Sequence, residues 1–145
     1  KLLARKASAV CVAYDHMEQF FPAEKIIFTG NPVRRDILDL QNKRQEAIQY
    51  YGLDPQKKTI VIVGGSMGAR TLNNALRDNT NLLKNNPQVQ VLWQCGKFYE
   101  FEFSGCDTAA LPNVQMKAFI DRMDLLYAAA DVVVSRAGAL TITYP

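Results

Sequence analysis

The chain has 145 residues, of which 48% are hydrophobic and 21% are charged, which excludes a disordered protein or a disulfide scaffold and allows one core of ordinary domain size. Seventeen basic and fourteen acidic residues give a formal net charge of +3, too small and too scattered to indicate nucleic-acid binding. No apolar run approaches the roughly 20 residues that cross a bilayer, and the start lacks the apolar stretch of a signal peptide, so we expect a soluble cytoplasmic protein, at most attached to a membrane surface.

The first elements along the chain are two apolar runs, at residues 9–14 and 25–29, with a polar stretch between them. The second run stops at the turn-forming sequence GNP, at residues 30–32, so this piece is interpreted as the tail of a separate layer. We therefore place a domain boundary near Arg34. Residues 36–52 are charged and helical in character, and Gly52 stands where a helix would end in a left-handed residue.

Four short runs rich in β-branched residues then alternate with helical patterns, at residues 59–63, 89–93, 114–119 and 131–134. The first and last runs are apolar without alternation, which is typical of central parallel strands covered by helices on both faces. The sequence therefore predicts an α/β fold with a Rossmann-like parallel sheet. In the strand order 3-2-1-4, the first and fourth of these strands are neighbours.

Helices are predicted between these strands. Apolar positions such as Leu72, Leu76 and Leu83 predict one helix that ends near residues 85–87, and a second is predicted over residues 122–130 with Asp121 as its N-cap. Residues 98–110 are ambiguous. A further helix would begin at residues 137–143, just before the sequence stops, so we expect the chain to be a segment of a longer polypeptide.

Two glycine-containing turns follow the first and fourth strands. The sequence GGSMGA, at residues 64–69, lies between a strand and a helix, where glycines permit a tight turn and free amides at the helix start favour an anion. It lacks the spacing of a P-loop or a dinucleotide site. In the predicted strand order, SRAGALT at residues 135–141 faces it across one crevice, which indicates a shared phosphate site; tight turns without a ligand are the alternative.

The third strand ends near Phe119 and Ile120, two strand spacings, or roughly 10 Å, from the first strand. That distance is about the reach of a nucleoside from its diphosphate. One interpretation is that Phe119 or the backbone at Ile120 contacts a base; the other is that both residues belong to the core.

Cysteine and histidine give no metal or disulfide pattern. Cys11, Cys95 and Cys106 form an odd set without CxxC spacing, and His16 has no acidic cluster at ligand spacing nearby. We expect free thiols and no metal site.

Four motifs resemble, in the same order, those of the MurG family of bacterial glycosyltransferases: GNPVR at residues 30–34, GGSMGA at 64–69, FIDRM at 119–123 and ADVVVSRAGALT at 130–141. The resemblance extends over residues 2–141. It implies a GT-B architecture, in which residues 1–34 would be the tail of the N-terminal acceptor domain with the interdomain connection. Residues 35–145 would be the first part of the C-terminal UDP-sugar-binding domain, truncated.

The resemblance also implies an activity, the inverting transfer of N-acetylglucosamine from UDP-N-acetylglucosamine to undecaprenyl-diphospho-muramoylpentapeptide. This reaction turns lipid I into lipid II in peptidoglycan synthesis. The residues implied to bind the donor are Arg34, Ser66, Phe119, Ile120, Ala139, Leu140 and Thr141. Ser66 would lie at the diphosphate, the backbone of Ile120 would contact uracil, and the last three would lie over the phosphates. The family has a glutamate for the ribose hydroxyls where this sequence has Tyr144.

The family's proposed base and acceptor loops would precede this segment, so no catalytic residue, metal or cofactor is expected in it, and the segment alone is expected to be inactive. The implied partners are UDP-N-acetylglucosamine, lipid I through parts outside the segment, and the membrane surface, with no nucleic acid. The intact enzyme would then act at the cytoplasmic face of the bacterial inner membrane. Two alternatives stay open: another GT-B nucleotide-sugar transferase, and a non-catalytic α/β binding module.

Overall fold

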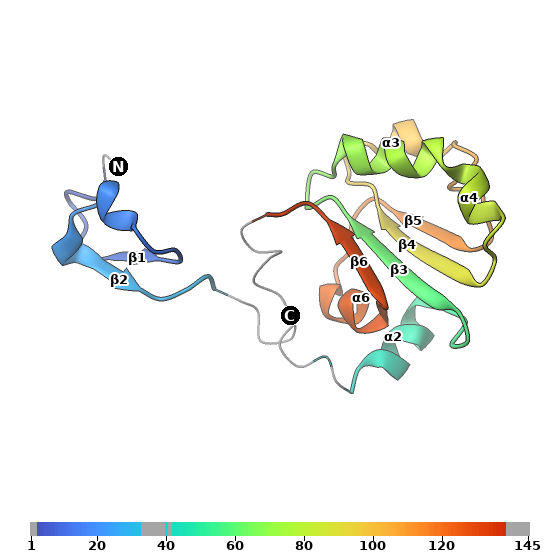
Figure 1. Cartoon of the computed structure of the whole chain (residues 1–145), viewed down its shortest axis with the longest axis horizontal. Coiled ribbons are helices and arrows are strands. Elements are labelled where there is room, and N and C mark those ends of the chain that lie inside the picture. The colour runs from blue at the N-terminus through green and yellow to red at the C-terminus, as the bar shows by residue number, and fades with distance from the viewer. Residues whose placement is uncertain (1–2, 33–39, 41, 139–145) are drawn as a thin grey trace.

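The computed structural model describes residues 3–32, 40 and 42–138, and it contains two parallel sheets (Figure 1). The smaller sheet pairs β1 (Val10–Val12) with β2 (Ile26–Phe28), and two short 3-10 helices, Met17–Gln19 and Ala23–Lys25, lie between them in the chain. Both predicted apolar runs are therefore strands. Arg34, where the sequence predicts a domain boundary, lies outside the described residues.

The larger sheet contains the four strands expected from the sequence. They are β3 (Lys58–Val63), β4 (Val89–Gln94), β5 (Val114–Lys117) and β6 (Val132–Ser135), all parallel, in the order β5-β4-β3-β6. The predicted α/β class and the order 3-2-1-4 are confirmed. The pairing aligns Val63 with Gln94 on one side and with Ser135 on the other. The last residues of β3, β4 and β6 are therefore in register, and the carboxyl ends of the three strands form one edge of the sheet.

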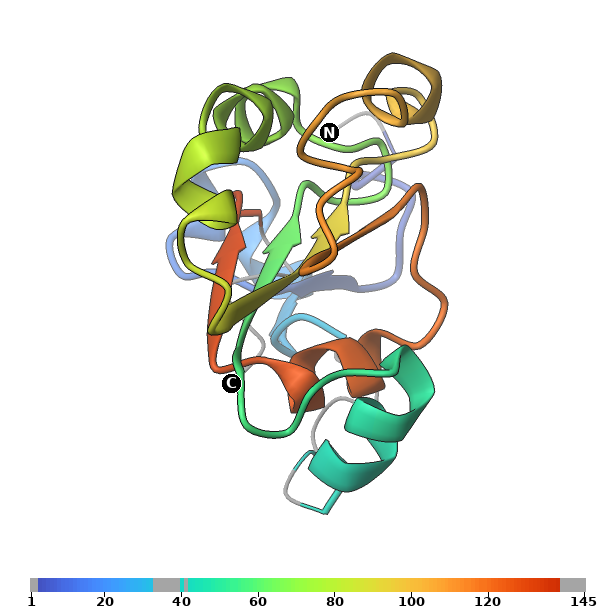
Figure 2. The same cartoon turned by 90° about the vertical axis from the view of Figure 1, so that its right-hand side faces the viewer.

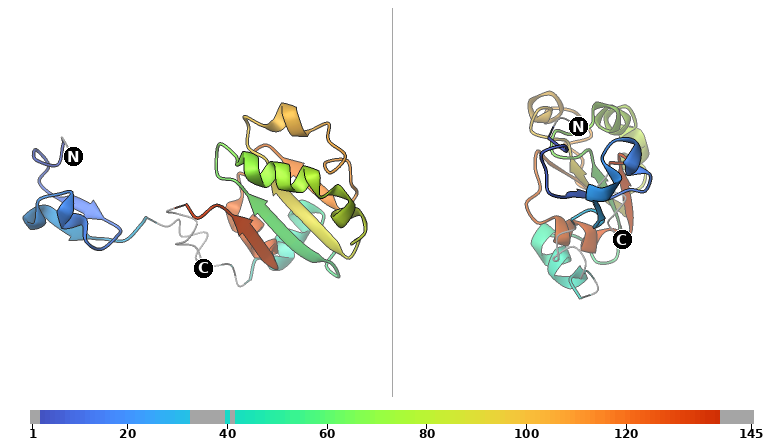
Figure 3. Two further views of the ribbon diagram at one scale, coloured as in Figure 1. Left: turned by 45° about the horizontal axis from the view of Figure 1, so that its top comes forward. Right: turned by 90° about the vertical axis from the view of Figure 1, so that its left-hand side faces the viewer.

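Helices cover both faces of the larger sheet (Figures 1 and 2). One face carries α2 (Arg44–Tyr51) and α6 (Met123–Ala129); the other carries α3 (Arg70–Asp78), α4 (Thr80–Lys84) and the single turn α5 (Glu100–Phe103), as the left view of Figure 3 also shows. Alternate residues of the strands enter two buried clusters, with Val61 and Leu92 facing α6 and Val91 and Trp93 facing α3. The prediction of a covered central strand is thus confirmed for β3. It is wrong for β6, which lies at the edge of the sheet and is exposed.

The single helix predicted between the first two strands is wrong, because the structure divides it into α3 and α4 at Asn79. The backbone of Asn79 leaves the helical region, with φ −114° and ψ 29°. Its side-chain amide donates to the carbonyl oxygen of Ala75 at 2.8 Å, and the Thr80 hydroxyl donates to that of Arg77 at 2.8 Å. Such side chains compete for the helix's own acceptors, which explains the break.

The prediction of Asp121 as N-cap is also wrong. Arg122 occupies that position, with no side-chain capping bond, and α6 begins at Met123. The acidic group at the helix start is Asp124, which accepts hydrogen bonds from the Arg122 guanidinium at 2.9 Å twice and from the Lys43 ammonium at 3.1 Å. Asp124 therefore places the negative charge in the first turn of α6, held by two cationic side chains.

Two other element ends differ from the prediction. The third strand ends at Lys117 rather than at residue 119, because the last ladder bond runs from the Cys95 N–H to the Lys117 carbonyl at 3.0 Å, where β4 has already ended. The helix expected over residues 36–52 begins only at Arg44, because residues 40, 42 and 43 are described and are not helical; residues 36–39 and 41 lie outside the described part. Its predicted end is confirmed, since Gly52 is left-handed with φ 61°.

Strand β6 forms the exposed edge of the sheet. Val132, Val133 and Val134 are all exposed among the described residues, whereas β4, on the other side of β3, is buried. Asp131, just before β6, connects this strand to its neighbour: its carboxylate accepts the Thr59 N–H at 2.8 Å and contacts Lys58 and Arg44 at 3.2 and 3.1 Å. These bonds fix the register of β6 on β3.

Replacing this carboxylate should weaken the sheet in a pH-dependent way. The Thr59 N–H, with help from Lys58 and Arg44, lowers the pKa of Asp131 to about 2. Because this is below the unfolded value of about 3.9, the contribution is complete above about pH 5 and is lost as the pH falls toward about 2. We expect Asp131→Asn to cost about 1–2 kcal/mol at neutral pH and to converge with the parent protein in acid.

The measurement is urea unfolding across that pH range. Asp107→Asn is the matched control, since Asp107 is exposed and no side-chain bond of it is found in the described part of the chain. Equal losses for both variants at neutral pH would show that the bonds of Asp131 do not stabilise the sheet.

The remaining features concern cysteines, metals and membranes. Cys11 is exposed, Cys95 is buried and Cys106 lies between, and all three carry free thiols. Within residues 3–32, 40 and 42–138, no group of three or more histidine, cysteine or acidic side chains is arranged to hold a metal ion. None of the described helices is long and apolar enough to cross a bilayer.

Candidate functional site

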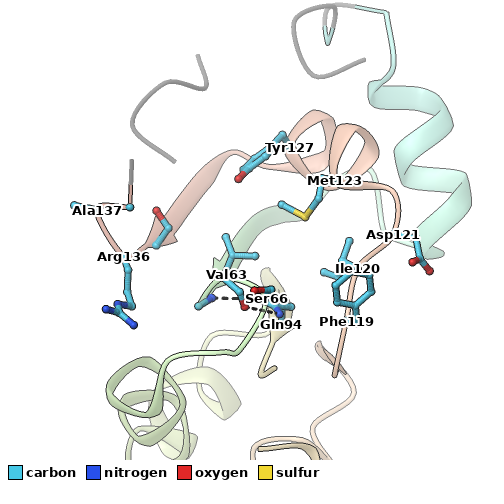
Figure 4. Close-up of a pocket in the computed structure, with 14 residues that line it drawn as sticks. Val63, Ser66, Gln94, Phe119, Ile120, Asp121, Met123, Tyr127, Arg136 and Ala137 are labelled. Atoms are coloured by element: carbon cyan, nitrogen blue, oxygen red, sulfur yellow. Dashed lines mark hydrogen bonds between the residues drawn. The ribbon is translucent and has the colours of Figure 1, made fainter. Parts of the chain in front are cut away.

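A pocket of about 640 Å³ lies at the carboxyl edge of the larger sheet (Figure 4). The ends of β3, β4 and β6, the loop after β5 and the start of α6 contribute to its walls. The lining residues are Val63, Gly64, Gly65, Ser66, Gln94, Phe119, Ile120, Asp121, Met123, Tyr127, Ser135, Arg136, Ala137 and Gly138. Both glycine-containing turns singled out in the sequence therefore border the same pocket, as the strand order predicts.

The turn after β3, residues 64–69, requires glycine for steric reasons. Gly68 has a positive φ of 78°, and a Cβ atom there would lie 2.0 Å from the carbonyl oxygen of Cys95. A Cβ atom on Gly64 would lie 2.3 Å from the backbone nitrogen of Ala69. The turn then enters α3 through Ala69, which is extended and offers no side-chain cap. The first amides of α3 therefore have no side-chain cap and are left to a ligand or to water.

Gln94 joins the two loops that border the pocket. Its amide oxygen accepts the Gly64 N–H at 3.2 Å, while its amide nitrogen donates to the carbonyl oxygens of Gly65 at 2.9 Å and Ala118 at 3.5 Å. Gln94 is 4% exposed, so these bonds are formed by a buried residue. One side chain thus sets the separation between the turn after β3 and the loop after β5.

The buried side-chain amide of Asn73 supports the turn at residues 64–69 from the side of the core. The Trp93 indole N–H donates to the side-chain oxygen of Asn73 at 2.9 Å, and the Asn73 amide donates to the carbonyl oxygen of Cys95 at 2.9 Å. Cys95 is the residue against which Gly68 packs, and burial raises the pKa of its thiol. The contact between Gly68 and the Cys95 carbonyl is therefore held in place by the buried side chains of Asn73 and Trp93.

The predicted site residues divide into two groups. Ser66, Phe119 and Ile120 are brought together around the pocket, whereas Arg34, Ala139, Leu140 and Thr141 lie outside the described residues. Ile120 is 6% exposed and belongs to the buried cluster with α6, so its side chain is both core and pocket wall. Phe119 is 44% exposed and is not a core residue. Their contacts with a ligand stay predictions.

Several lining residues were not named individually from the sequence, although Arg136 lies in the turn at residues 135–141 that was expected to face a phosphate site. Arg136 is the one basic residue that lines the pocket in the described part of the chain, and Asp121 is the one acidic residue. Met123 and Tyr127, four residues apart on α6, form an apolar wall opposite the turn after β3 (Figure 4). The sequence does hold a signal for Arg136: a basic residue directly after an apolar strand lies at the carboxyl edge of the sheet, where ligands bind. The signal for Gln94 is weaker, because it is only a polar residue at the end of a buried strand.

These features together suit a ligand with an anionic part and a flat, less polar part. The turn after β3, the first amides of α3 and the Arg136 guanidinium favour negative charge. Phe119, Met123 and Tyr127 offer apolar and aromatic surface on the other side of the pocket.

Known proteins resemble the chain over nearly its whole length. Residues 59–143 match the glycosyltransferase family 28 C-terminal domain. A protein of Flavobacterium psychrophilum is 53% identical over 99% of this chain and 38% of its own length, and one of Bacteroides fragilis is 52% identical over 99% and 38%. Both are named UDP-N-acetylglucosamine–N-acetylmuramyl-(pentapeptide) pyrophosphoryl-undecaprenol N-acetylglucosamine transferase.

A solved structure agrees with these sequences. The crystal structure of Acinetobacter baumannii MurG superposes with a TM-score of 0.54 at 31% identity, over 98% of this chain and 37% of that one. The chain thus spans little more than a third of the length of the relatives it matches. Since the family's C-terminal domain accounts for more than half of the residues, and the parallel α/β sheet agrees with it, the chain belongs to glycosyltransferase family 28.

Proposed function

We propose that the protein is an inverting N-acetylglucosaminyltransferase that uses UDP-N-acetylglucosamine and undecaprenyl-diphospho-muramoylpentapeptide, and that the pocket binds the UDP part of the donor. The observation that carries the proposal is the position of Ser66 and Arg136 on two turns that border one pocket at the carboxyl edge of a parallel sheet. The names of the relatives supply the sugar and the acceptor.

In this proposal the diphosphate lies against residues 64–69. The Ser66 hydroxyl and the first amides of α3 donate to its oxygens, and Arg136 supplies a positive charge. The base lies toward Phe119 and the backbone of Ile120, with the apolar side chains of α6 opposite. The distance between the diphosphate end and the base end of the pocket is set by Gln94, which bonds to Gly65 and to Ala118.

The reaction is a displacement at the anomeric carbon of the donor. The C4 hydroxyl oxygen of the muramoyl sugar forms the new bond to that carbon, and the bond to the diphosphate oxygen breaks with its electron pair remaining on UDP. The hydroxyl proton passes to a base outside the described residues. The groups around residues 64–69 stabilise the charge that develops on UDP, the leaving-group half of the reaction.

The untested assignments complete the proposal. Arg34, Ala139, Leu140 and Thr141 would add donor contacts, residues 1–34 would belong to the acceptor domain, and residues 35–145 to the donor domain. The acceptor and the membrane surface would be contacted by other parts of the protein, at the cytoplasmic face of the membrane.

The proposal is tested by measuring UDP release from UDP-N-acetylglucosamine by the full-length product of the gene, with and without a soluble lipid I analogue. Release that depends on the acceptor is expected. UDP-glucose, tested in parallel, separates this activity from a transferase of another sugar, and a binding titration with NAD tests for a dinucleotide-binding module. Acceptor-dependent release with UDP-glucose alone, or none with any donor, would contradict it.

Ser66→Ala provides a residue-level check. Loss of one hydroxyl donor to a charged oxygen removes about 1.5–3 kcal/mol of binding energy, so kcat/KM for the donor should fall roughly 10- to 150-fold. The thermal midpoint of unfolding should change little. Ser104→Ala, at an exposed serine that follows α5, is the matched control and should change neither. A lower midpoint with unchanged donor kinetics would show that Ser66 only supports the turn.

A further inference from the structure

Lys97 follows β4 in a tight turn beside the pocket, and its ammonium group lies over an aromatic ring. The Nζ atom is 4.7 Å from the centre of the Phe119 ring. Lys97 is exposed, and the structure places no carboxylate at ion-pair distance from it among residues 3–32, 40 and 42–138. Its charge is therefore directed at Phe119 and not at an acidic neighbour.

The backbone before Lys97 is fixed by close packing. Gly96 has a φ of 92°, and a Cβ atom there would lie 2.5 Å from the Cα atom of Gly68. The Cys95 N–H donates to the Lys117 carbonyl at 3.0 Å, and the Tyr99 N–H donates to the Gly96 carbonyl at 2.9 Å. The Lys97 side chain therefore starts from a backbone that is packed on the turn after β3 and bonded to the end of β5.

Phe119 has no comparable support. It lies two residues beyond the end of β5, is 44% exposed, and makes no ring-to-ring contact with the other aromatic side chains that the structure describes. An exposed phenylalanine of this kind changes rotamer within picoseconds to nanoseconds. A ligand that stacks on it must then immobilise the ring, which weakens binding.

We propose that Lys97 is a positioning residue that orders the Phe119 ring as the wall against which a nucleotide base stacks. The cation over the ring restricts the rotamers of Phe119 before the ligand arrives, so less conformational entropy is lost when the ligand binds. Lys97 itself contacts neither the base nor the phosphates. This inference rests on the proposed function, because it takes a nucleotide as the ligand of the pocket.

The test is an NMR titration of the full-length product of the gene with uridine and with UDP. Lys97→Met removes the charge and keeps an unbranched side chain, so both dissociation constants should rise by about two- to fivefold, the strength of an exposed cation–π contact. Lys97→Arg should restore both, since a guanidinium keeps the contact. Lys84→Met, at the exposed end of α4, is the matched control and should leave both unchanged.

A second variant separates positioning from direct charge. Phe119→Leu alone should abolish the upfield ring-current shift of the Lys97 Hε protons, and adding Lys97→Met to it should not change either dissociation constant further. A loss for UDP with none for uridine would assign Lys97 to the phosphates and overturn the proposal, as would unchanged constants for both ligands. If the parent protein binds neither ligand, the proposed function fails as well, so the two failures are distinguishable.

Discussion

The Gly68→Ala variant is expected to lose about 3–5 kcal/mol of folding free energy and to bind UDP far more weakly in the full-length protein. Two costs add here. A positive φ of 78° costs a residue with a Cβ atom about 1–2 kcal/mol, and the new atom would lie 2.0 Å from the Cys95 carbonyl oxygen and 2.9 Å from the Tyr99 ring. The carbonyl cannot move freely, because the Asn73 amide is bonded to it.

Urea unfolding and a UDP titration measure the two effects. Gly52→Ala is the matched control, since Gly52 has a similar φ of 61° but no atom within 4 Å of the new Cβ. It should cost only the conformational part, about 1–2 kcal/mol, and leave UDP binding unchanged. If Gly68→Ala is no more destabilising than Gly52→Ala, the close packing of residues 64–69 on the loop after β4 is not significant for stability.

Asp124→Asn should give the other large effect, a loss of about 2–4 kcal/mol in folding free energy. The Asp124 carboxylate is 2% exposed and accepts from Arg122 and Lys43; these cations hold its pKa well below the usual range. The amide keeps the shape but loses both charged bonds. The loss stays below that of a fully buried pair because Arg122 and Lys43 reach solvent and Arg122 keeps Glu46 as a partner at 3.2 Å.

The same variant should weaken UDP binding, because α6 carries the apolar wall formed by Met123 and Tyr127. Asp78→Asn is the matched control: Asp78 also pairs with an arginine, at 3.0 Å, but 60% of its side chain is exposed, so its replacement should cost close to nothing. The two variants are compared by urea unfolding at neutral pH. Equal midpoints would show that the buried carboxylate does not stabilise α6.

The order of the larger sheet was predictable because each strand carries its own signal. Runs such as residues 59–63 are short, apolar and followed by glycine, so their parallel pairing and the meeting of two turns at one edge follow from general rules of α/β folds. Ser66, Phe119 and Ile120 could be placed at one pocket for the same reason.

The division of the helix at Asn79 was not predictable from apolar periodicity. Leu76 and Leu83 are both buried and lie seven positions apart, as one continuous helix requires. The break depends on side-chain bonds from Asn79 and Thr80 to carbonyl groups of the preceding turn, and periodicity does not report them.

The roles of Gln94 and Lys97 were hidden for a different reason. Gln94 bonds to Gly65 and Ala118, which are 29 and 24 positions away, and Lys97 meets Phe119 only because β4 and β5 are neighbours. Such partners are brought together by the completed sheet. A single sequence gives the residue types, but it does not pair them.

The pairing of β6 with β3 has a consequence for the newly made chain. Asp131 lies 72 positions after its partner Thr59, while β4 follows β3 much more closely. A ribosome that adds about 5–20 residues per second therefore leaves one edge of β3 without its neighbour for several seconds after that strand has emerged. During this interval an apolar edge is open to other nascent chains and to chaperones. The exposed Lys58 at its start places a charge on that edge until Asp131 is synthesised and neutralises it.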